Sequence, residues 1–419
     1  MGSSVEGTGD VYIPRLVDPL IERLFQELPA IQVVGPRASG KSTTARRLAA
    51  TTVPLDDPNV AAAFAADPDA ALRGLAEPVL LDEWQAVPEV LGSIKRSVDR
   101  DSRPGRFLVT GSVRAPFDGQ TWPGTGRIIN VTMGPLTERE VSGDAHAPSF
   151  FDRLIDDANL PVMDLAGSDL RDYVDLALRG GFPQVVTDRS TEARARWLAS
   201  YVDHVVTRDG EELFDRDPHR LRRYLEAVAA NTAGVIEDKR LYDAAGITRP
   251  TALGYERLLQ SLYLLDLVPS WSSNRLQRIV SQPKRYLVDP ALDACILGAD
   301  SDDVLRDGDL LGRLLDTYVL AQLRAEAEVA VRRPLIHHLR DQGGRHEVDL
   351  LADFGHTGVL AIEVKATATP KPGMIRHLAW LRDRLGDRFI RGVLFHTGVA
   401  SIEMDDRIVA LPISAIANG

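Results

Sequence analysis

The chain has 419 residues, 44% of them hydrophobic, so we expect two or three domains with substantial cores. A formal net charge of −11 excludes a basic protein that coats nucleic acid, so any nucleic-acid contact has to be a local patch. The single cysteine, Cys295, excludes a disulfide framework and a cysteine-rich zinc site, and no apolar run reaches the ~18 residues of a membrane-spanning helix. We therefore expect a cytoplasmic α/β protein with no membrane partner and a disordered lead over residues 1–11.

The first predicted strand, Ala30 to Val34, runs into a glycine-containing loop, and a helix is predicted from Thr43 to Ala50. The loop fits the phosphate-loop pattern G-x-x-x-x-G-K-[ST] and consists of Gly35, Pro36, Arg37, Ala38, Ser39, Gly40, Lys41 and Ser42, with Thr43 directly after it. Glycines let backbone N–H groups surround a phosphate chain, and the helix N-terminus adds positive potential. Lys41 can reach the β- and γ-phosphates of ATP, and Ser42 can ligate Mg²⁺.

Two further strands carry polar residues at their ends. The apolar run at 78–81 is followed by Asp82 and Glu83, which predicts a carboxylate for the Mg²⁺ shell and a base for the attacking water. The strand predicted from Arg106 ends at Thr110, whose hydroxyl could sense the γ-phosphate or orient that water. A plain turn at the end of this strand explains Thr110 equally well. These strands and the one predicted at 127–133 indicate a parallel sheet with helices on both faces over residues 12–145.

Only six of the 49 basic residues are lysines, and the rest are arginines. Arginine is bulkier and forked, so a lysine indicates a place that arginine does not fill. Lys41 and Lys365 are two such places.

A helical connector is predicted over 146–220, and a winged helix over 221–292. Two short helices, a turn at Gly246 and a third helix from Thr251 to Ser261 resemble a helix-turn-helix, and the segments 263–271 and 284–288 could form its wing. The predicted wing tip carries four basic residues that could contact phosphates: Arg275, Arg278, Lys284 and Arg285. The same fold could equally be a helical lid or an oligomerisation module.

The C-terminal module, predicted over 300–419, contains strands at 335–340, 347–353 and 359–366, and a five-residue loop joins the last two. A pivot at His356 places Asp349 opposite Glu363, with Lys365 on the same face and Asp316 on a preceding helix. Carboxylates placed in this way bind a divalent cation, and the lysine can act on a water or on developing charge. A cross-strand ion network with no function would use the same residues.

Several motifs along the chain resemble a prokaryotic family of AAA-type P-loop ATPases fused to a C-terminal domain of the restriction-endonuclease type, PD-(D/E)xK. The matching segments are GPRASGKST at 35–43, LLDEWQ at 80–85, LVTGS at 108–112, PLTEREV at 135–141, GGFP at 180–183, PKRYLVDPAL at 283–292, EVDLL at 347–351 and IEVKA at 362–366. The resemblance implies ATP binding, a winged helix and a nuclease-like domain whose metal is Mg²⁺ or Mn²⁺. Asp316 stands where this family usually has a glutamate.

Arg127 is a candidate arginine finger or sensor for the γ-phosphate, and Arg37 and Arg114 compete for the role. The leading hypothesis is an Mg²⁺-dependent ATPase coupled to a domain directed at DNA or RNA. The alternative is a nucleotide-dependent switch with slow turnover and an inactive nuclease scaffold. A second copy of the chain is a further candidate partner.

Overall fold

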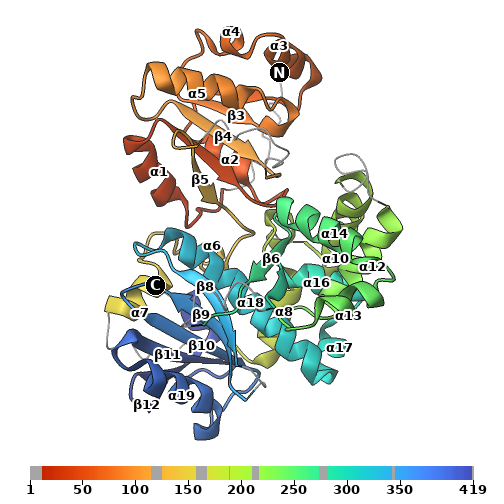
Figure 1. Ribbon diagram of the computed structural model, residues 1–419, viewed down its shortest axis with the longest axis vertical. Helices are drawn as coiled ribbons and strands as arrows, with labels where there is room; N and C mark the ends of the chain where they lie inside the picture. Colours follow the sequence, from red (N-terminus) through yellow and green to blue (C-terminus); the bar gives the residue numbers. More distant parts are fainter. Residues whose placement is uncertain are drawn as a thin grey trace, which may run out of the picture.

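The computed structural model describes residues 12–114, 125–156, 168–187, 189–209, 217–272, 282–341 and 345–417. Three parts follow one another along the chain: an N-terminal sheet with its helices, a helical middle, and a C-terminal sheet (Figure 1). The predicted lead at 1–11 and the predicted basic residues Arg275 and Arg278 lie outside the described residues.

The N-terminal part is a five-stranded parallel sheet in the order β2-β3-β4-β1-β5, as the alternating pattern predicts. Its strands are β1 Ala30–Val34, β2 Thr51–Pro54, β3 Val79–Asp82, β4 Phe107–Gly111 and β5 Ile129–Thr132. Its helices are α1 Asp18–Glu27, α2 Lys41–Arg46, α3 Pro58–Ala66, α4 Pro68–Leu72 and α5 Val90–Arg100.

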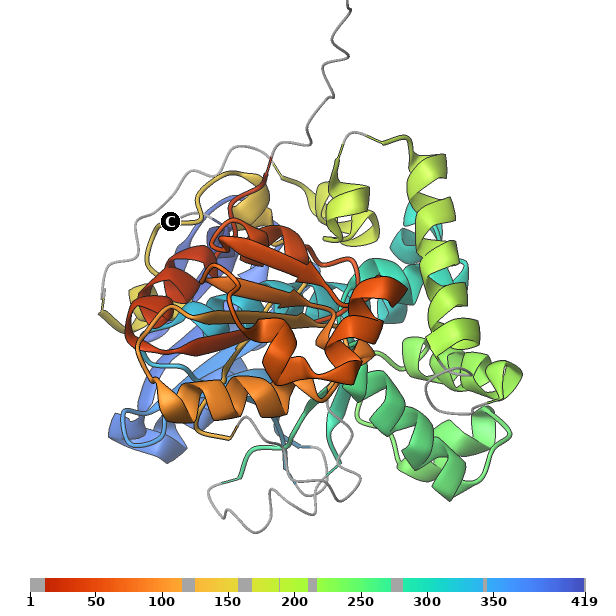
Figure 2. The ribbon, with the colours of Figure 1, turned by 90° about the horizontal axis from the view of Figure 1, so that it is seen from above.

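Side chains alternate between the two faces of this sheet, so each face has its own core. Ile31 and Val33 pack with α1 and α2, whereas Val79 and Val109 pack with α5 on the other side. The sheet is seen between its helices in Figure 2. Because all five strands are parallel, their carboxyl ends lie at one edge, where the loops after β1, β3 and β4 meet.

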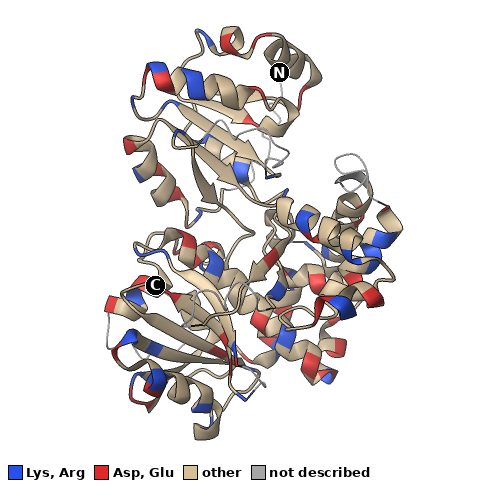
Figure 3. Ribbon diagram, in the orientation of Figure 1, with Lys and Arg blue, Asp and Glu red and all other residues tan. Residues whose placement is uncertain are grey.

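The middle part is mostly helical. Its helices are α6 Glu138–Val141, α7 Phe150–Asp156, α8 Leu170–Arg179, α9 Pro183–Val186, α10 Thr191–His204, α12 Pro218–Ala229, α13 Asp238–Ala244, α14 Arg249–Ser261, α16 Pro290–Leu297 and α17 Ser301–Arg306. An antiparallel pair, β6 Leu265–Val268 and β7 Lys284–Leu287, follows α14. Three helices and two strands therefore stand in the predicted order, with Gly246 at φ 64° in the turn between α13 and α14. Basic and acidic residues are mixed along the ribbon of α12 and α13 (Figure 3).

The C-terminal part is a six-stranded mixed sheet in the order β12-β13-β11-β10-β9-β8. Its strands are β8 Leu335–Arg340, β9 Glu347–Asp353, β10 Val359–Lys365, β11 Phe389–His396, β12 Ile402–Asp405 and β13 Ile408–Pro412. The long helix α18 Gly308–Val329 packs on one face together with α7 and α8, and α19 Arg376–Leu385 packs on the other.

The register predicted for the β9–β10 hairpin is confirmed. Val359 pairs with Asp353, and Ile362 pairs with Leu350. The next pair in this register is Asp349 with Glu363, so both carboxylates stand on one face of the hairpin.

Candidate functional site

The phosphate loop between β1 and α2 has a backbone that favours glycine at two positions. Gly35 has φ 154°, and a Cβ there would lie 2.0 Å from the carbonyl oxygen of Met133. Gly40, the residue before α2, has φ 94°. The loop is thus held close to the end of β5, and its N–H groups are free of side-chain bulk at both ends.

Lys41, the first residue of α2, is buried inside this loop and is only 3% exposed. Its ammonium donates a hydrogen bond to the carbonyl oxygen of Pro36 at 2.7 Å. Burial lowers the pKa of Lys41 to about 8, although the carboxylates of Glu83 and Asp82 act in the opposite direction. A poorly solvated cation is therefore held where a phosphate chain would lie across the loop.

The Asp82 carboxylate accepts hydrogen bonds from hydroxyl groups of two elements, α2 and β4. The hydroxyl of Ser42 donates to Asp82 Oδ1 at 2.6 Å, and the hydroxyl of Thr110, at the end of β4, donates to the same oxygen. Carboxylate and hydroxyl oxygens are the ligands that Mg²⁺ prefers, so Ser42 and Asp82 fit the predicted metal role. Thr110 also accepts a hydrogen bond from the backbone N–H of Glu83 at 3.3 Å, so its contacts within the protein position both acids.

Glu83 lies directly after β3 in the left-handed backbone region, with φ 57°. Its carboxylate accepts hydrogen bonds from the Gln85 side-chain amide and, at 3.3 Å, from the Ser112 hydroxyl. A non-glycine residue at positive φ costs free energy and persists only where its surroundings hold it. Gln85 is one of the residues that hold Glu83, so it belongs to the site. Sequence reasoning missed Gln85, although it stands two residues after the predicted base.

A second missed residue is Arg15, which precedes α1. Its guanidinium donates to the carbonyl oxygen of Ser39 in the phosphate loop at 2.7 Å and to Glu140 Oε1 at 3.0 Å. Arg15 is 3% exposed and lies 24 residues before Ser39, so no local sequence signal connects it to the loop.

The structure places Arg127, the candidate arginine finger or sensor, away from the phosphate loop of its own chain, and its role stays a prediction. Arg127 precedes β5 and pairs with Asp99, near the end of α5, at 2.9 Å. The start of β5 lies at the edge of the parallel sheet opposite to the phosphate loop.

The competing candidates, Arg114 and Arg37, lie at the end of the sheet where the phosphate loop is. The Arg114 guanidinium lies 4.7 Å from the centre of the Tyr263 ring. Arg37 is exposed in the loop itself, and its carbonyl oxygen accepts a hydrogen bond from Tyr201 of α10 at 3.3 Å.

The second predicted site also assembles around the β9–β10 hairpin. Lys365 Nζ lies 2.6 Å from Glu363 Oε2 and 3.4 Å from Asp349 Oδ2, which also accepts the N–H of Val364 at 3.0 Å. Burial and the Asp349 charge raise the pKa of Glu363 to about 8. Burial would raise the pKa of Asp349 as well, but the ammonium groups of Lys284 and Lys365 outweigh it and lower the pKa to about 2.

Asp316 of α18 reaches this cluster through two residues of β7. Its Oδ2 accepts hydrogen bonds from Lys284 Nζ at 3.1 Å and from the Tyr286 hydroxyl at 3.2 Å. Lys284 Nζ is also 3.5 Å from Asp349 Oδ1. Burial raises the pKa of Asp316 to about 6, against the lowering effect of Lys284.

The prediction that Lys284 and Arg285 contact nucleic acid at the surface is wrong. Lys284 and Arg285 are 2% and 4% exposed. Arg285 pairs with Glu256 and with Asp238, each at 2.7 Å. The strand β7 starts at Lys284, so its first residues lie in the protein interior and not at a wing tip.

The structure agrees only in part with the prediction that Asp316, Asp349 and Glu363 together form a metal site. Within the described residues, no group of three or more His, Cys, Asp or Glu side chains is arranged to hold a metal ion. Asp316, Asp349 and Glu363 do lie in one cluster, but lysine ammonium groups lie between them.

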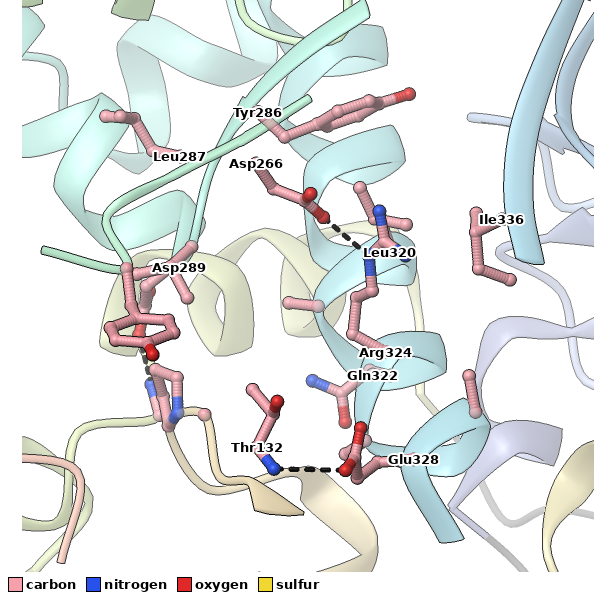
Figure 4. A pocket seen from close by; sticks show the side chains of 18 of the residues that line it. Thr132, Asp266, Tyr286, Leu287, Asp289, Leu320, Gln322, Arg324, Glu328 and Ile336 are labelled. Carbon is pink, nitrogen blue, oxygen red and sulfur yellow. Dashed lines mark hydrogen bonds and ion pairs between the residues drawn. The ribbon is translucent and has the colours of Figure 1, made fainter. Parts of the chain in front are cut away.

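A cavity of about 660 Å³ lies among the three parts of the molecule (Figure 4). Its lining includes Pro36 of the phosphate loop, Thr132 of β5 and several residues of β6, β7 and α18. Glu328 of α18 accepts the N–H of Thr132 at 3.0 Å, and Arg324 pairs with Asp266 of β6 at 2.5 Å (Figure 4). The end of the parallel N-terminal sheet is thus joined to the other two parts around this cavity.

Three family models match successive segments of the chain. Residues 27–142 match an AAA domain, whereas residues 170–303 and 311–416 match domains of unknown function, DUF8612 and DUF4143. The first match supports the P-loop ATPase domain predicted from the phosphate loop. The C-terminal match names no endonuclease fold, so that assignment stays a prediction. In the described part of the chain, no helix combines the length and apolar character needed to cross a bilayer.

The chain is similar in sequence to two uncharacterized proteins, Rv2008c of Mycobacterium tuberculosis and Mb2031c of Mycobacterium bovis. Each is 28% identical over an alignment of 404 residues that covers 94% of this chain and 82% of the relative. Among solved structures, the Walker-type ATPase of Pyrococcus abyssi matches with a TM-score of 0.43 and 15% identity, over 69% of this chain and 97% of that one. A RuvB variant of Thermotoga maritima gives a TM-score of 0.28 and 18% identity, over 60% and 89% of the two chains. TM-scores this low carry no argument about function.

Proposed function

We propose that this protein is a Mg²⁺-dependent ATPase whose nucleotide-binding domain acts on a nuclease-like C-terminal domain directed at nucleic acid. The observation that carries the ATPase is the meeting of Lys41, Ser42, Asp82 and Glu83 at one edge of the parallel sheet. When bound, Mg²⁺ would be held by Ser42 and Asp82 and would neutralise charge on the phosphates.

The chain's own residues then have separate tasks. The loop backbone binds the phosphates, and the Lys41 ammonium attracts their β- and γ-oxygens. Glu83 takes the proton of the attacking water, a role for which the base needs a fixed orientation. Gln85 and Ser112 hold its carboxylate, and Thr110 holds its backbone.

A continuous set of contacts supports coupling between the phosphate loop and the C-terminal part. Arg15 connects Ser39 of the loop to Glu140 in α6. The neighbouring residue in α6, Arg139, pairs with Glu326 of α18 at 2.9 Å, with both side chains 1% exposed. Asp316 lies on the same helix α18, about 15 Å from Glu326 at 1.5 Å per residue.

A continuous set of contacts couples two sites only when both sites shift the conformational equilibrium of one shared element. In our proposal this element is α18. Hydrogen exchange of α18 with and without ATP tests it. We expect ATP to change exchange in wild-type α18 and to have a smaller effect in Glu326→Gln. No change on ATP binding in either protein would contradict the coupling.

The ATPase proposal is tested first by nucleotide binding. Lys41→Ala should weaken ATP affinity strongly in titration calorimetry, because the variant keeps the backbone cradle and loses the point charge on the phosphates. Lys95→Ala is the matched control, since Lys95 pairs with Asp99 on the surface of α5. Equal affinity of Lys41→Ala and wild type would refute the phosphate-loop assignment.

The nucleic-acid proposal is supported by the converged Asp349, Glu363 and Lys365, and it is tested by cleavage. Labelled single- and double-stranded DNA and RNA should be cut with Mg²⁺ or Mn²⁺, with ATP altering the rate, and Glu363→Gln should abolish cutting. The second candidate, a nucleotide-dependent switch with an inactive nuclease scaffold, is favoured by the Lys284 ion pairs with Asp316 and Asp349. It predicts ATP binding, slow turnover and no cleavage of any nucleic acid.

A further inference from the structure

The C-terminal acidic cluster contains a buried lysine that comes from another part of the chain. Lys284 opens β7 in the middle part, whereas Asp316 lies on α18 and Asp349 on β9. Lys284 is 2% exposed, and these two carboxylates compensate its charge within the cluster. Burying an ammonium group costs several kcal/mol unless carboxylates and further oxygens surround it. Packing of apolar side chains alone therefore does not explain why Lys284 is buried here.

The oxygens around this ammonium are of the kind that a hard divalent cation prefers. They are Asp316 Oδ2 at 3.1 Å, Asp349 Oδ1 at 3.5 Å and the backbone carbonyl oxygen of Asp349 at 3.4 Å. Carboxylate and carbonyl oxygens are ligands of Mg²⁺ and Ca²⁺, which they bind at about 2.0–2.6 Å. A metal that bridges Asp316 and Asp349 would need the space that the ammonium fills.

Two carboxylate oxygens of the cluster remain without a partner. Asp316 Oδ1 and Glu363 Oε1 are buried and accept no hydrogen bond from the described residues. Buried carboxylate oxygens are costly to leave unsatisfied. The cluster therefore has more acceptor capacity than the two lysines use.

We propose that Lys284 is an intramolecular substitute for a divalent cation, so that β7 keeps the C-terminal acidic site closed and its withdrawal creates a metal site. This inference rests on the cation-binding role proposed above for Asp349 and Glu363, and it adds the element that controls access. Tyr286 is two residues further along β7 and donates to the same carboxylate of Asp316, so both side chains leave together if β7 moves. The structure then represents the closed form.

Manganese binding tests the substitution directly. Full-length protein with Asp82→Asn, which removes the carboxylate proposed to hold the cation of the nucleotide site, is titrated with Mn²⁺ without nucleotide, and free Mn²⁺ is followed by electron paramagnetic resonance. Adding Lys284→Met should create one additional Mn²⁺ site per chain, and adding Asp349→Asn as well should abolish it. Lys239→Met replaces an exposed lysine of α13 and should leave the stoichiometry unchanged.

A thermal measurement covers the case in which a neutral residue at this position weakens the fold. Mn²⁺ should raise the melting temperature of Lys284→Met and of Lys284→Gln, and it should not raise that of the background protein. Equal Mn²⁺ stoichiometry with and without Lys284 would overturn the proposal, as would a site that survives Asp349→Asn. Failure of the ATPase or nuclease proposal would appear separately, as missing ATP turnover or missing cleavage, while the Mn²⁺ count still decides the role of Lys284.

Discussion

The buried ion pair between Arg139 and Glu326 leads to a quantitative prediction about how α6, which contacts the phosphate loop through Arg15, is joined to α18. Arg139 Nη1 lies 3.0 and 2.9 Å from the two oxygens of Glu326, and the backbone N–H of Phe150 donates to Glu326 Oε2 at 2.7 Å. Glu326→Ala leaves a buried guanidinium without its counter-charge and a buried N–H without its acceptor. Breaking a buried pair from one side costs about 3–5 kcal/mol, and we expect a loss of that size.

Urea unfolding followed by tryptophan fluorescence measures this loss as a change in the free energy of unfolding. The matched control is Glu192→Ala, because Glu192 pairs with Arg196 at 3.0 Å while both side chains are at least 75% exposed. An exposed pair contributes about 0–1 kcal/mol, so the control should unfold almost as wild type does. If Glu326→Ala and Glu192→Ala cost the same, the junction is not held by this pair.

Two further variants test Arg127 and Arg285, which the structure places in ion pairs within the chain. Arg127→Ala should leave ATP turnover of the isolated chain within about twofold of wild type, because Arg127 pairs with Asp99 at the end of the sheet opposite to the phosphate loop. A steady-state ATPase assay checks this, and a large loss of turnover would show that Arg127 does act at the nucleotide site. Arg285→Met should destabilise the protein by up to about 3–5 kcal/mol in urea, since the partly buried Glu256 loses its counter-charge. The same variant should leave the salt dependence of any DNA binding unchanged, and a flatter salt slope would show that Arg285 contacts phosphates after all.

The elements that the sequence predicts best are those with strong local signals. The strand at 30–34 and the strands at 335–340 and 347–353 have the bounds that apolar runs and alternation indicate. The β9–β10 register also follows from local information, because the loop length determines which residues face one another. The phosphate-loop pattern after a strand is also local, so the motif alone is enough to predict that Lys41 and Ser42 contact phosphate.

The errors arise where a residue's partner is far away in the chain. Lys284 and Arg285 carry charge in a segment that looks like an exposed wing, and only the tertiary structure brings acids from α18, β9, α13 and α14 to them. Arg15 contacts the phosphate loop across 24 residues, and its role depends on Glu140, 125 residues away. Periodicity and spacing contain no information about such pairs, since they depend on how the parts dock.

The most direct test of the central claim is the turnover of ATP by Glu83→Gln. The amide keeps the size of the side chain and its contact with Ser112 but cannot take a proton from water, and loss of a general base costs about 10²–10⁴-fold. We predict that single-turnover assays with Mg²⁺ show a decrease of this size, while calorimetry shows ATP bound as tightly as by wild type. Hydrolysis at the wild-type rate by Glu83→Gln would contradict the proposed mechanism.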